Sequence, residues 1–96
     1  TLEQLVEKVS HGPARLFKVA ERGYLREGYW ADLVLIDLAS PYRVEREGVL
    51  YKCGWSPLEG KRLRSRVVAT MVNGQMAYYE GRLNPVMLGQ RLMFSR

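Results

Sequence analysis

The 96 residues suffice for one small domain with a thin core, and contents of 47% hydrophobic and 26% charged residues are typical of a globular protein, not of a disordered or collagen-like one. A single histidine and a single cysteine exclude a disulfide framework and a His/Cys zinc cluster within these residues. The net charge of +5 favours negatively charged partners such as nucleic acid, an acidic surface or an anionic substrate.

The chain starts at Thr1, and its first methionine is Met71. We therefore expect it to be a piece of a longer protein. The sequence has no apolar run of the roughly 18 residues that a membrane-spanning helix needs, and it does not open like a secretory signal.

Residues 1–22 carry a helical pattern. Thr1 and Gln4 have the spacing of a capping box, which predicts a helix start. Residues 10–12 are predicted to break this helix, and Pro13 to begin a second, short one. The apolar residues of the first helix recur at helical spacing: Leu2, Leu5, Val6 and Val9.

From residue 24 the pattern becomes that of strands. Residues 31–38 form the most apolar run, which predicts a central strand covered on both faces, with the cover coming in part from outside the chain. Residues 53–60 are predicted to form a loop because they are rich in glycine and proline. Further strands are predicted within residues 42–46, 49–52, 62–72 and 75–79.

Asn73-Gly74 is the strongest hairpin signal, because both central positions of a type I′ turn need a positive φ. Glu80-Gly81 is predicted to end the returning strand. Residues 84–96 fit either a helical turn or an extended tail. The predicted fold class is α+β, with two helices followed by four or five antiparallel strands.

The sole imidazole and the sole thiol are the first candidates for chemistry. His11 could act as a general base or metal ligand, but no carboxylate stands at a motif spacing from it, which favours a structural role at a helix end. Cys53 would need a neighbouring base to act as a nucleophile, and the sequence identifies none. An inert loop thiol is therefore the favoured interpretation.

A basic cluster follows the loop, at Lys61, Arg62, Arg64 and Arg66. These side chains could track phosphates, with Tyr42, Tyr51 and Trp55 as stacking partners. The three arginines are two residues apart, however, which places them on one face of one strand and favours a solvated face.

Asp32 and Asp37 flank the apolar strand, and paired carboxylates suggest acid/base chemistry. Five residues apart on a strand, they lie about 16 Å from each other and point to opposite faces. Hydrogen bonds to backbone amides at the strand ends are the favoured interpretation.

Several strings together resemble the cyclic amidohydrolases. Residues 10–17 resemble the S-x-N-P-A-x-x-F segment near the end of the barrel, and residues 23–37 resemble G-x-L-x-x-G-x-x-A-D-L-V-L-x-D. Residues 56–60 and 70–74 are similar to the pair S-P-x-E-G and T-x-V-N-G, which points to the dihydroorotase branch. Gly12 stands where this family usually has Asn, and it keeps a positive φ available at a helix end.

The resemblance implies a (β/α)8 barrel followed by a small β-sandwich built jointly by both ends of the protein. Residues 1–22 would be the last barrel helices, residues 23–83 the C-terminal part of the sandwich and residues 84–96 a tail. The family uses two zinc ions bridged by hydroxide and a carboxylated lysine, with all ligands upstream of Thr1. The resemblance thus implies no catalytic, cofactor-binding or metal-binding residue in this chain, which would be inactive alone.

The implied partners are the upstream barrel of the same protein and a small-molecule substrate. The resemblance implies neither nucleic acid nor a membrane as partner, and it leaves a homo-oligomer possible. The implied location is the cytoplasm. Two alternatives remain within the family: another cyclic amidase of the allantoinase or hydantoinase type, and a metal-less scaffold homologue. An alternative from another class is a free-standing basic module that binds nucleic acid.

Overall fold

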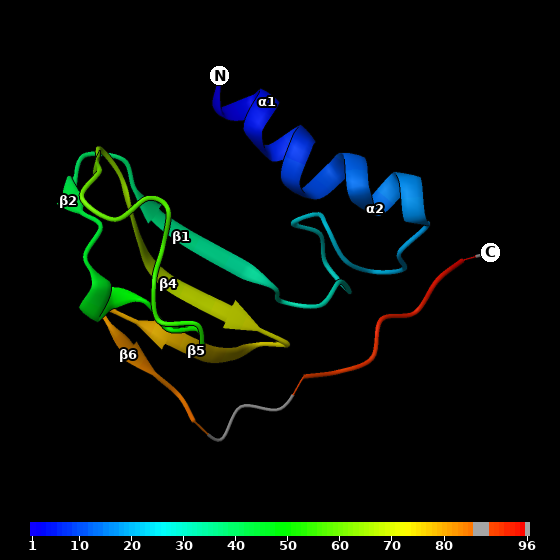
Figure 1. Cartoon of the computed structure of the whole chain (residues 1–96). Coiled ribbons are helices and arrows are strands. Elements are labelled where there is room, and N and C mark those ends of the chain that lie inside the picture. Colours follow the sequence, from blue (N-terminus) through cyan, green and yellow to red (C-terminus); the bar gives the residue numbers. More distant parts are fainter. Residues whose placement is uncertain (86–88, 96) are drawn as a thin grey trace.

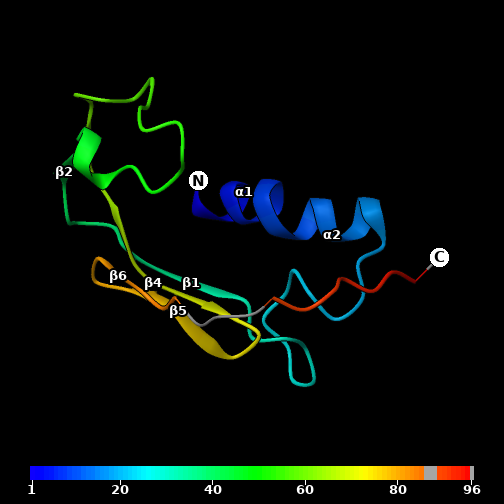
Figure 2. The ribbon, with the colours of Figure 1, turned by 60° about the horizontal axis from the view of Figure 1, so that its bottom comes forward.

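A computed structural model describes residues 1–85 and 89–95 and shows a helical segment followed by antiparallel strands (Figure 1). The predicted α+β class is therefore confirmed. In the view of Figure 2 the helical segment and the main sheet form separate layers, with the chain between residues 18 and 32 connecting them.

The helical segment is continuous, so the predicted break at residues 10–12 is wrong. Its three parts follow one another without an interruption: α1 at Leu2–Val6, the π-helical turn η1 at Glu7–His11 and α2 at Gly12–Phe17. The predicted capping box is confirmed, since the Thr1 side chain accepts from the Gln4 backbone N–H and the Gln4 side chain accepts from the Thr1 amine.

The π-helical turn explains how the helix passes through these residues. Pro13 has no N–H to donate. In the wider turn the Gly12 N–H donates to the Glu7 carbonyl, five residues back, so the helix continues up to the proline. Gly12 has φ −58°, an ordinary helical value, so the positive φ that glycine keeps available is not used here. Glycine is needed here for space, because a Cβ at this position would lie 2.8 Å from the Glu7 carbonyl oxygen.

The main sheet has the strand order β1-β4-β5-β6 and is antiparallel throughout. Its strands are β1 at Leu33–Asp37, β4 at Arg66–Val72, β5 at Gln75–Tyr79 and β6 at Arg82–Leu83. The prediction that the apolar strand is central is wrong for the part of the chain described: β1 pairs only with β4 and forms an edge. Every residue of β1 is exposed, including Val34 at 58% and Leu35 at 59%.

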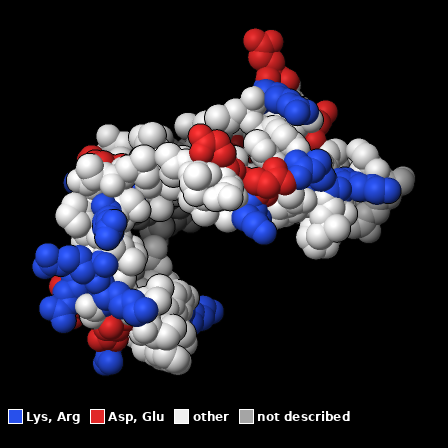
Figure 3. Space-filling model, turned by 90° about the horizontal axis from the view of Figure 1, so that it is seen from above, with Lys and Arg blue, Asp and Glu red and all other residues white. Residues whose placement is uncertain are grey.

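A second, two-stranded sheet pairs β2, Tyr42–Arg43, with β3, Arg62–Leu63. The 3-10 helix η2, Arg46–Gly48, follows β2. The strand predicted at residues 49–52 is absent from the structure described, because the chain turns there and no neighbouring strand pairs with it. The loop at residues 53–60 is confirmed. Lysine and arginine side chains gather around this second sheet and its loop, at the lower left of Figure 3.

The predicted Asn73-Gly74 hairpin is confirmed. Asn73 has φ 53° and Gly74 has φ 78°, as a type I′ turn requires, and Val72 pairs with Gln75 across the turn. Glu80 and Gly81 have positive φ as well, at 44° and 87°. They begin a second hairpin that pairs β5 with β6, where the sequence predicts only a strand end.

The C-terminal tail is extended where it is described. The Ala20 N–H donates to the Met93 carbonyl at 2.7 Å, the Ser95 N–H donates to the Lys18 carbonyl at 2.8 Å, and Val19 forms an antiparallel bridge with residue 94. Residues 86–88 and 96 of the predicted tail lie outside the described residues. The end of the chain is thus fixed next to the exit of the helix (Figure 1).

Few side chains are buried, as expected for a thin core. Among the described residues only Ala14 and Ala69 are buried apolar side chains, and Arg22 is the buried charged one. Large apolar side chains lie exposed on the helix, such as Leu16 at 74%, as well as on the sheet. No helix in the described part of the chain has the length and apolar character needed to span a membrane.

We predict that Gly74→Val destabilises the protein by about 1–3 kcal/mol. Because space beside Gly74 is open, the cost comes from the positive φ alone, which a β-branched residue resists. The free energy of unfolding in denaturant measures it. Gly48→Val is the control, since Gly48 also faces open space but has no positive φ; equal effects at both positions would contradict the turn argument.

Gly12→Ala should destabilise by about 1–3 kcal/mol through overpacking. In an ordinary helix the same change stabilises by about 1 kcal/mol, so the sign of the effect tests the π-helical turn. The added methyl would meet the Glu7 carbonyl oxygen. Denaturant unfolding of Gly12→Ala and of the control Gly48→Ala decides between a π-helical turn and an ordinary α-helix. Stabilisation by Gly12→Ala would show that the turn has ordinary α-helical geometry.

Candidate functional site

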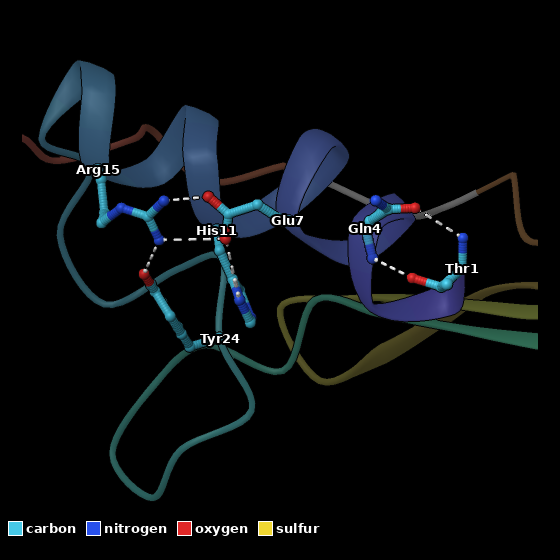
Figure 4. Close-up of polar contacts among 6 residues, drawn as sticks. All are labelled: Thr1, Gln4, Glu7, His11, Arg15 and Tyr24. Carbon is cyan, nitrogen blue, oxygen red and sulfur yellow. Dashed lines mark hydrogen bonds and ion pairs between the residues drawn. The ribbon is translucent and has the colours of Figure 1, made fainter.

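A polar cluster surrounds His11 where the helix faces the loop that follows it (Figure 4). The imidazole stacks on the Tyr24 ring, with 4.1 Å between the ring centroids and an angle of 10° between the planes. Its Nδ1 lies 3.9 Å from a Glu7 carboxylate oxygen. The structure therefore gives His11 an aromatic and a helical neighbour, which favours the structural interpretation over that of a general base.

Arg15 completes this cluster. Its guanidinium donates to both Glu7 carboxylate oxygens and, at 3.1 Å, to the Tyr24 hydroxyl. The hydrogen bond from Arg15 lowers the pKa of Glu7, and the same bond raises the pKa of Arg15. Arg26 also joins this network, because its guanidinium carbon lies 4.2 Å from the centroid of the Tyr24 ring. Because Arg15 engages the Glu7 carboxylate, the cluster fastens the loop to the helix and Glu7 is not a free base.

Cys53 is exposed, and its Sγ contacts the Trp55 carbonyl oxygen at 3.7 Å. The structure brings no base to this thiol among the contacts described. Within residues 1–85 and 89–95, no group of three or more His, Cys, Asp and Glu side chains could hold a metal ion. The zinc ligands that the family resemblance implies would lie upstream of Thr1, outside these residues.

The two aspartates form hydrogen bonds to backbone amides, as predicted. Asp37 Oδ1 accepts from the Ala39 N–H at 2.9 Å and closes the turn after β1. Asp32 Oδ1 accepts from the Asn73 N–H at 2.8 Å, so it reaches from the start of β1 to the β4–β5 hairpin. Neither carboxylate is arranged as one half of an acid/base pair.

Sequence reasoning missed the second partner of Asp32. Arg22 donates to Asp32 Oδ2, is only 8% exposed and lies 4.9 Å from the Trp30 ring centroid. Within the described residues the Nε and Nη2 of Arg22 have no hydrogen-bond partner. A buried arginine is rare unless it is paired, but nothing in the local sequence distinguishes Arg22 from an exposed one. The Arg22–Asp32 pair positions the hairpin and the loop against each other.

The basic cluster departs from the prediction of one continuous strand. Arg62 ends up in β3 and Arg66 in β4, with a bend at residues 64–65 between the two sheets. All three arginines are exposed, as expected for a solvated face. Arg66 lies over the Tyr42 ring at 5.1 Å and donates to the Pro41 carbonyl at 3.4 Å, so Tyr42 is covered and is not a free stacking platform.

Residues 1–78 match the sequence pattern of the amidohydrolase family. The chain belongs to this family. It is 29% identical over 93 residues to a dihydroorotase of Pyrococcus horikoshii, a match that covers 97% of this chain and 22% of that enzyme. It is 32% identical over 77 residues to an allantoinase of Desulfitobacterium hafniense, covering 80% of this chain and 17% of that enzyme.

A solved structure of L-hydantoinase (dihydropyrimidinase) from Arthrobacter aurescens has the same fold over 88% of this chain and 19% of its own, with 32% identity and a TM-score of 0.78. These findings confirm the resemblance to the dihydroorotase branch drawn from the sequence motifs. The chain spans about a fifth of the length of the curated relatives it matches.

The Glu7–Arg15 ion pair makes the stability of the fold depend on pH. The pKa of Glu7 in the folded state is below its ordinary value of 4.5. As the pH falls, the Glu7 carboxylate is therefore protonated in the unfolded chain before it is protonated in the folded one. The stability contributed by the pair is present above pH 4.5 and is lost as the pH falls through the lowered folded-state pKa.

We predict that Glu7→Gln flattens the loss of melting temperature between about pH 6 and about pH 3. Thermal unfolding across this range measures it. Glu3→Gln, in the first turn of the same helix, is the matched control and should keep the acid dependence of the unsubstituted protein. A pH profile of Glu7→Gln that matches that of the unsubstituted protein would refute the role of the pair.

Proposed function

We propose that this chain is the C-terminal, non-catalytic portion of a dihydroorotase, a metal-dependent hydrolase that interconverts dihydroorotate and N-carbamoyl-aspartate in pyrimidine biosynthesis. The observation that carries the proposal is the match over 97% of the chain to a protein named dihydroorotase. The motif pair at residues 56–60 and 70–74 supports the same branch of the family.

The proposed parts are those that the resemblance implies. Residues 1–22 supply the last helices of the barrel, residues 23–83 the C-terminal part of the small β-sandwich and residues 84–96 the tail. Support comes from the exposed apolar surface: Leu16 on the helix and Leu35 on β1 need a partner layer, and the free edge of β1 can accept another strand. The partner in this proposal is the upstream barrel of the same protein.

The chemistry would then reside outside these residues. Hydrolysis of a cyclic amide by a zinc enzyme requires convergent ligands that hold the metal and lower the pKa of its water. The described residues include no such ligand group. The proposed role of this chain is to complete the fold that carries the site.

A different cyclic amidase is the second candidate. An allantoinase and the L-hydantoinase structure are each 32% identical to this chain, which supports it, although one dihydroorotase reaches 38% identity over 78 residues. All three reactions act on cyclic amides, so the choice between them is a choice of substrate.

The test compares the full-length protein that contains this chain with residues 1–96 alone. We expect the full-length protein to bind zinc and to turn over dihydroorotate at least about tenfold faster, by kcat/KM, than allantoin or hydantoin. The isolated chain should bind no stoichiometric zinc, show no turnover and self-associate through its exposed apolar faces. Elemental analysis, hydrolysis assays and sedimentation measure these outcomes.

Turnover of dihydroorotate by residues 1–96, or zinc near one per chain, would refute the non-catalytic role. Preference of the full-length protein for allantoin or hydantoin would replace dihydroorotase with the second candidate.

A further inference from the structure

The positive charge of the chain is concentrated in one part of the molecule, the basic lobe, which we define as residues 42–66. It contains the two-stranded sheet, η2 and the long loop. Seven lysines and arginines stand there against three glutamates, a net charge of +4 out of +5 for the whole chain. Figure 3 shows these basic side chains gathered at one end of the molecule. The rest of the chain is close to neutral.

Two arginines of the basic lobe face each other. Arg43 of β2 and Arg62 of β3 are direct cross-strand partners, so their side chains project from the same face of the two-stranded sheet. Like charges at directly opposed positions destabilise a sheet. Neither arginine has an ion-pair partner in the part of the chain described, whereas Arg46 is paired with Glu59 at 3.5 Å. The opposed pair is therefore a site that an external anion would stabilise.

There is room for such a group beside Arg43. Gly60 has no side chain, and a Cβ built there would lie 3.9 Å from Arg43 Nη2. The open hollow of about 850 Å³ that also adjoins Arg43 is lined by three glutamates and not by Arg62, so the carboxylate would lie at the arginine pair and outside this hollow. Tyr51 and Trp55 lie on the loop of the same lobe and are 52% and 56% exposed. Exposed tyrosine, tryptophan and arginine are the residue types enriched where proteins bind one another.

We propose that the basic lobe docks a carboxylate-rich segment of a partner protein, with Arg43 and Arg62 clamping a carboxylate between them. Guanidinium groups bind carboxylates through paired hydrogen bonds, which suits two arginines better than a diffuse lysine patch. Glu45, Glu47 and Glu59 repel any long polyanion, whether nucleic acid or polyglutamate, so the partner that fits brings only one or two carboxylates to the arginine pair. A short acidic segment meets this requirement.

The experiment measures binding of a labelled short peptide with two neighbouring glutamates to the full-length protein that contains this chain, by fluorescence anisotropy. We expect saturable binding that weakens as salt rises from about 50 to about 200 mM. Arg43→Gln combined with Arg62→Gln should weaken it at least about tenfold. Arg82→Gln combined with Arg91→Gln is the matched control, since it removes the same two charges from exposed positions outside the lobe, and it should change affinity less than about twofold.

A second variant keeps the test valid if the double variant folds poorly. Arg62→Glu places a carboxylate opposite Arg43 within the sheet, where it should raise the melting temperature and abolish peptide binding by occupying the site. Absence of peptide binding, an equal loss in the Arg82→Gln/Arg91→Gln control, or undiminished binding by Arg62→Glu would overturn the proposal. Tighter binding of a single-stranded oligonucleotide of the same length would overturn it in favour of nucleic acid.

Discussion

The carboxylate of Asp32 joins the two parts of this chain. One oxygen accepts from the buried Arg22 of the loop after the helix, and the other accepts from the Asn73 N–H in the hairpin turn. The Gly74 N–H donates to the neighbouring Ala31 carbonyl at 3.0 Å, which aligns the turn with the start of β1. Without this carboxylate a buried guanidinium would lose its counter-charge, a costly state. The placement of the sheet relative to the loop thus depends on one side chain.

Little apolar burial supports that ion pair. The buried apolar side chains described are two alanines, Ala14 and Ala69, which contribute little hydrophobic free energy. The backbone is nonetheless well ordered into hairpins and a capped helix. Local hydrogen bonding and turn geometry therefore define the elements, while the described residues cover few of the apolar side chains. This division agrees with a chain that spans about a fifth of its curated relatives.

Local signals predicted the structure well, and long-range ones did not. The capping box at Thr1 and the turn at Asn73 depend on residues within a few positions, so their sequence patterns are sufficient. The helix break predicted at residues 10–12 was wrong, because the π-helical turn needs the small size of Gly12, whose φ is an ordinary helical value. The strand at residues 49–52 was wrong because a strand needs a partner that the local sequence does not reveal. The burial of Arg22 likewise depends on the fold.

The pairing of the tail with the helix exit has a consequence for folding kinetics. Residues 18–20 and 93–95 come together from distant parts of the sequence, so this contact closes the longest loop among the backbone hydrogen bonds of the described residues. Hairpins between neighbouring strands close much smaller loops and form in microseconds. The tail contact thus carries the highest entropic cost, and it should form last and open first. Unfolding of this chain would therefore begin with the separation of residues 93–95 from residues 18–20.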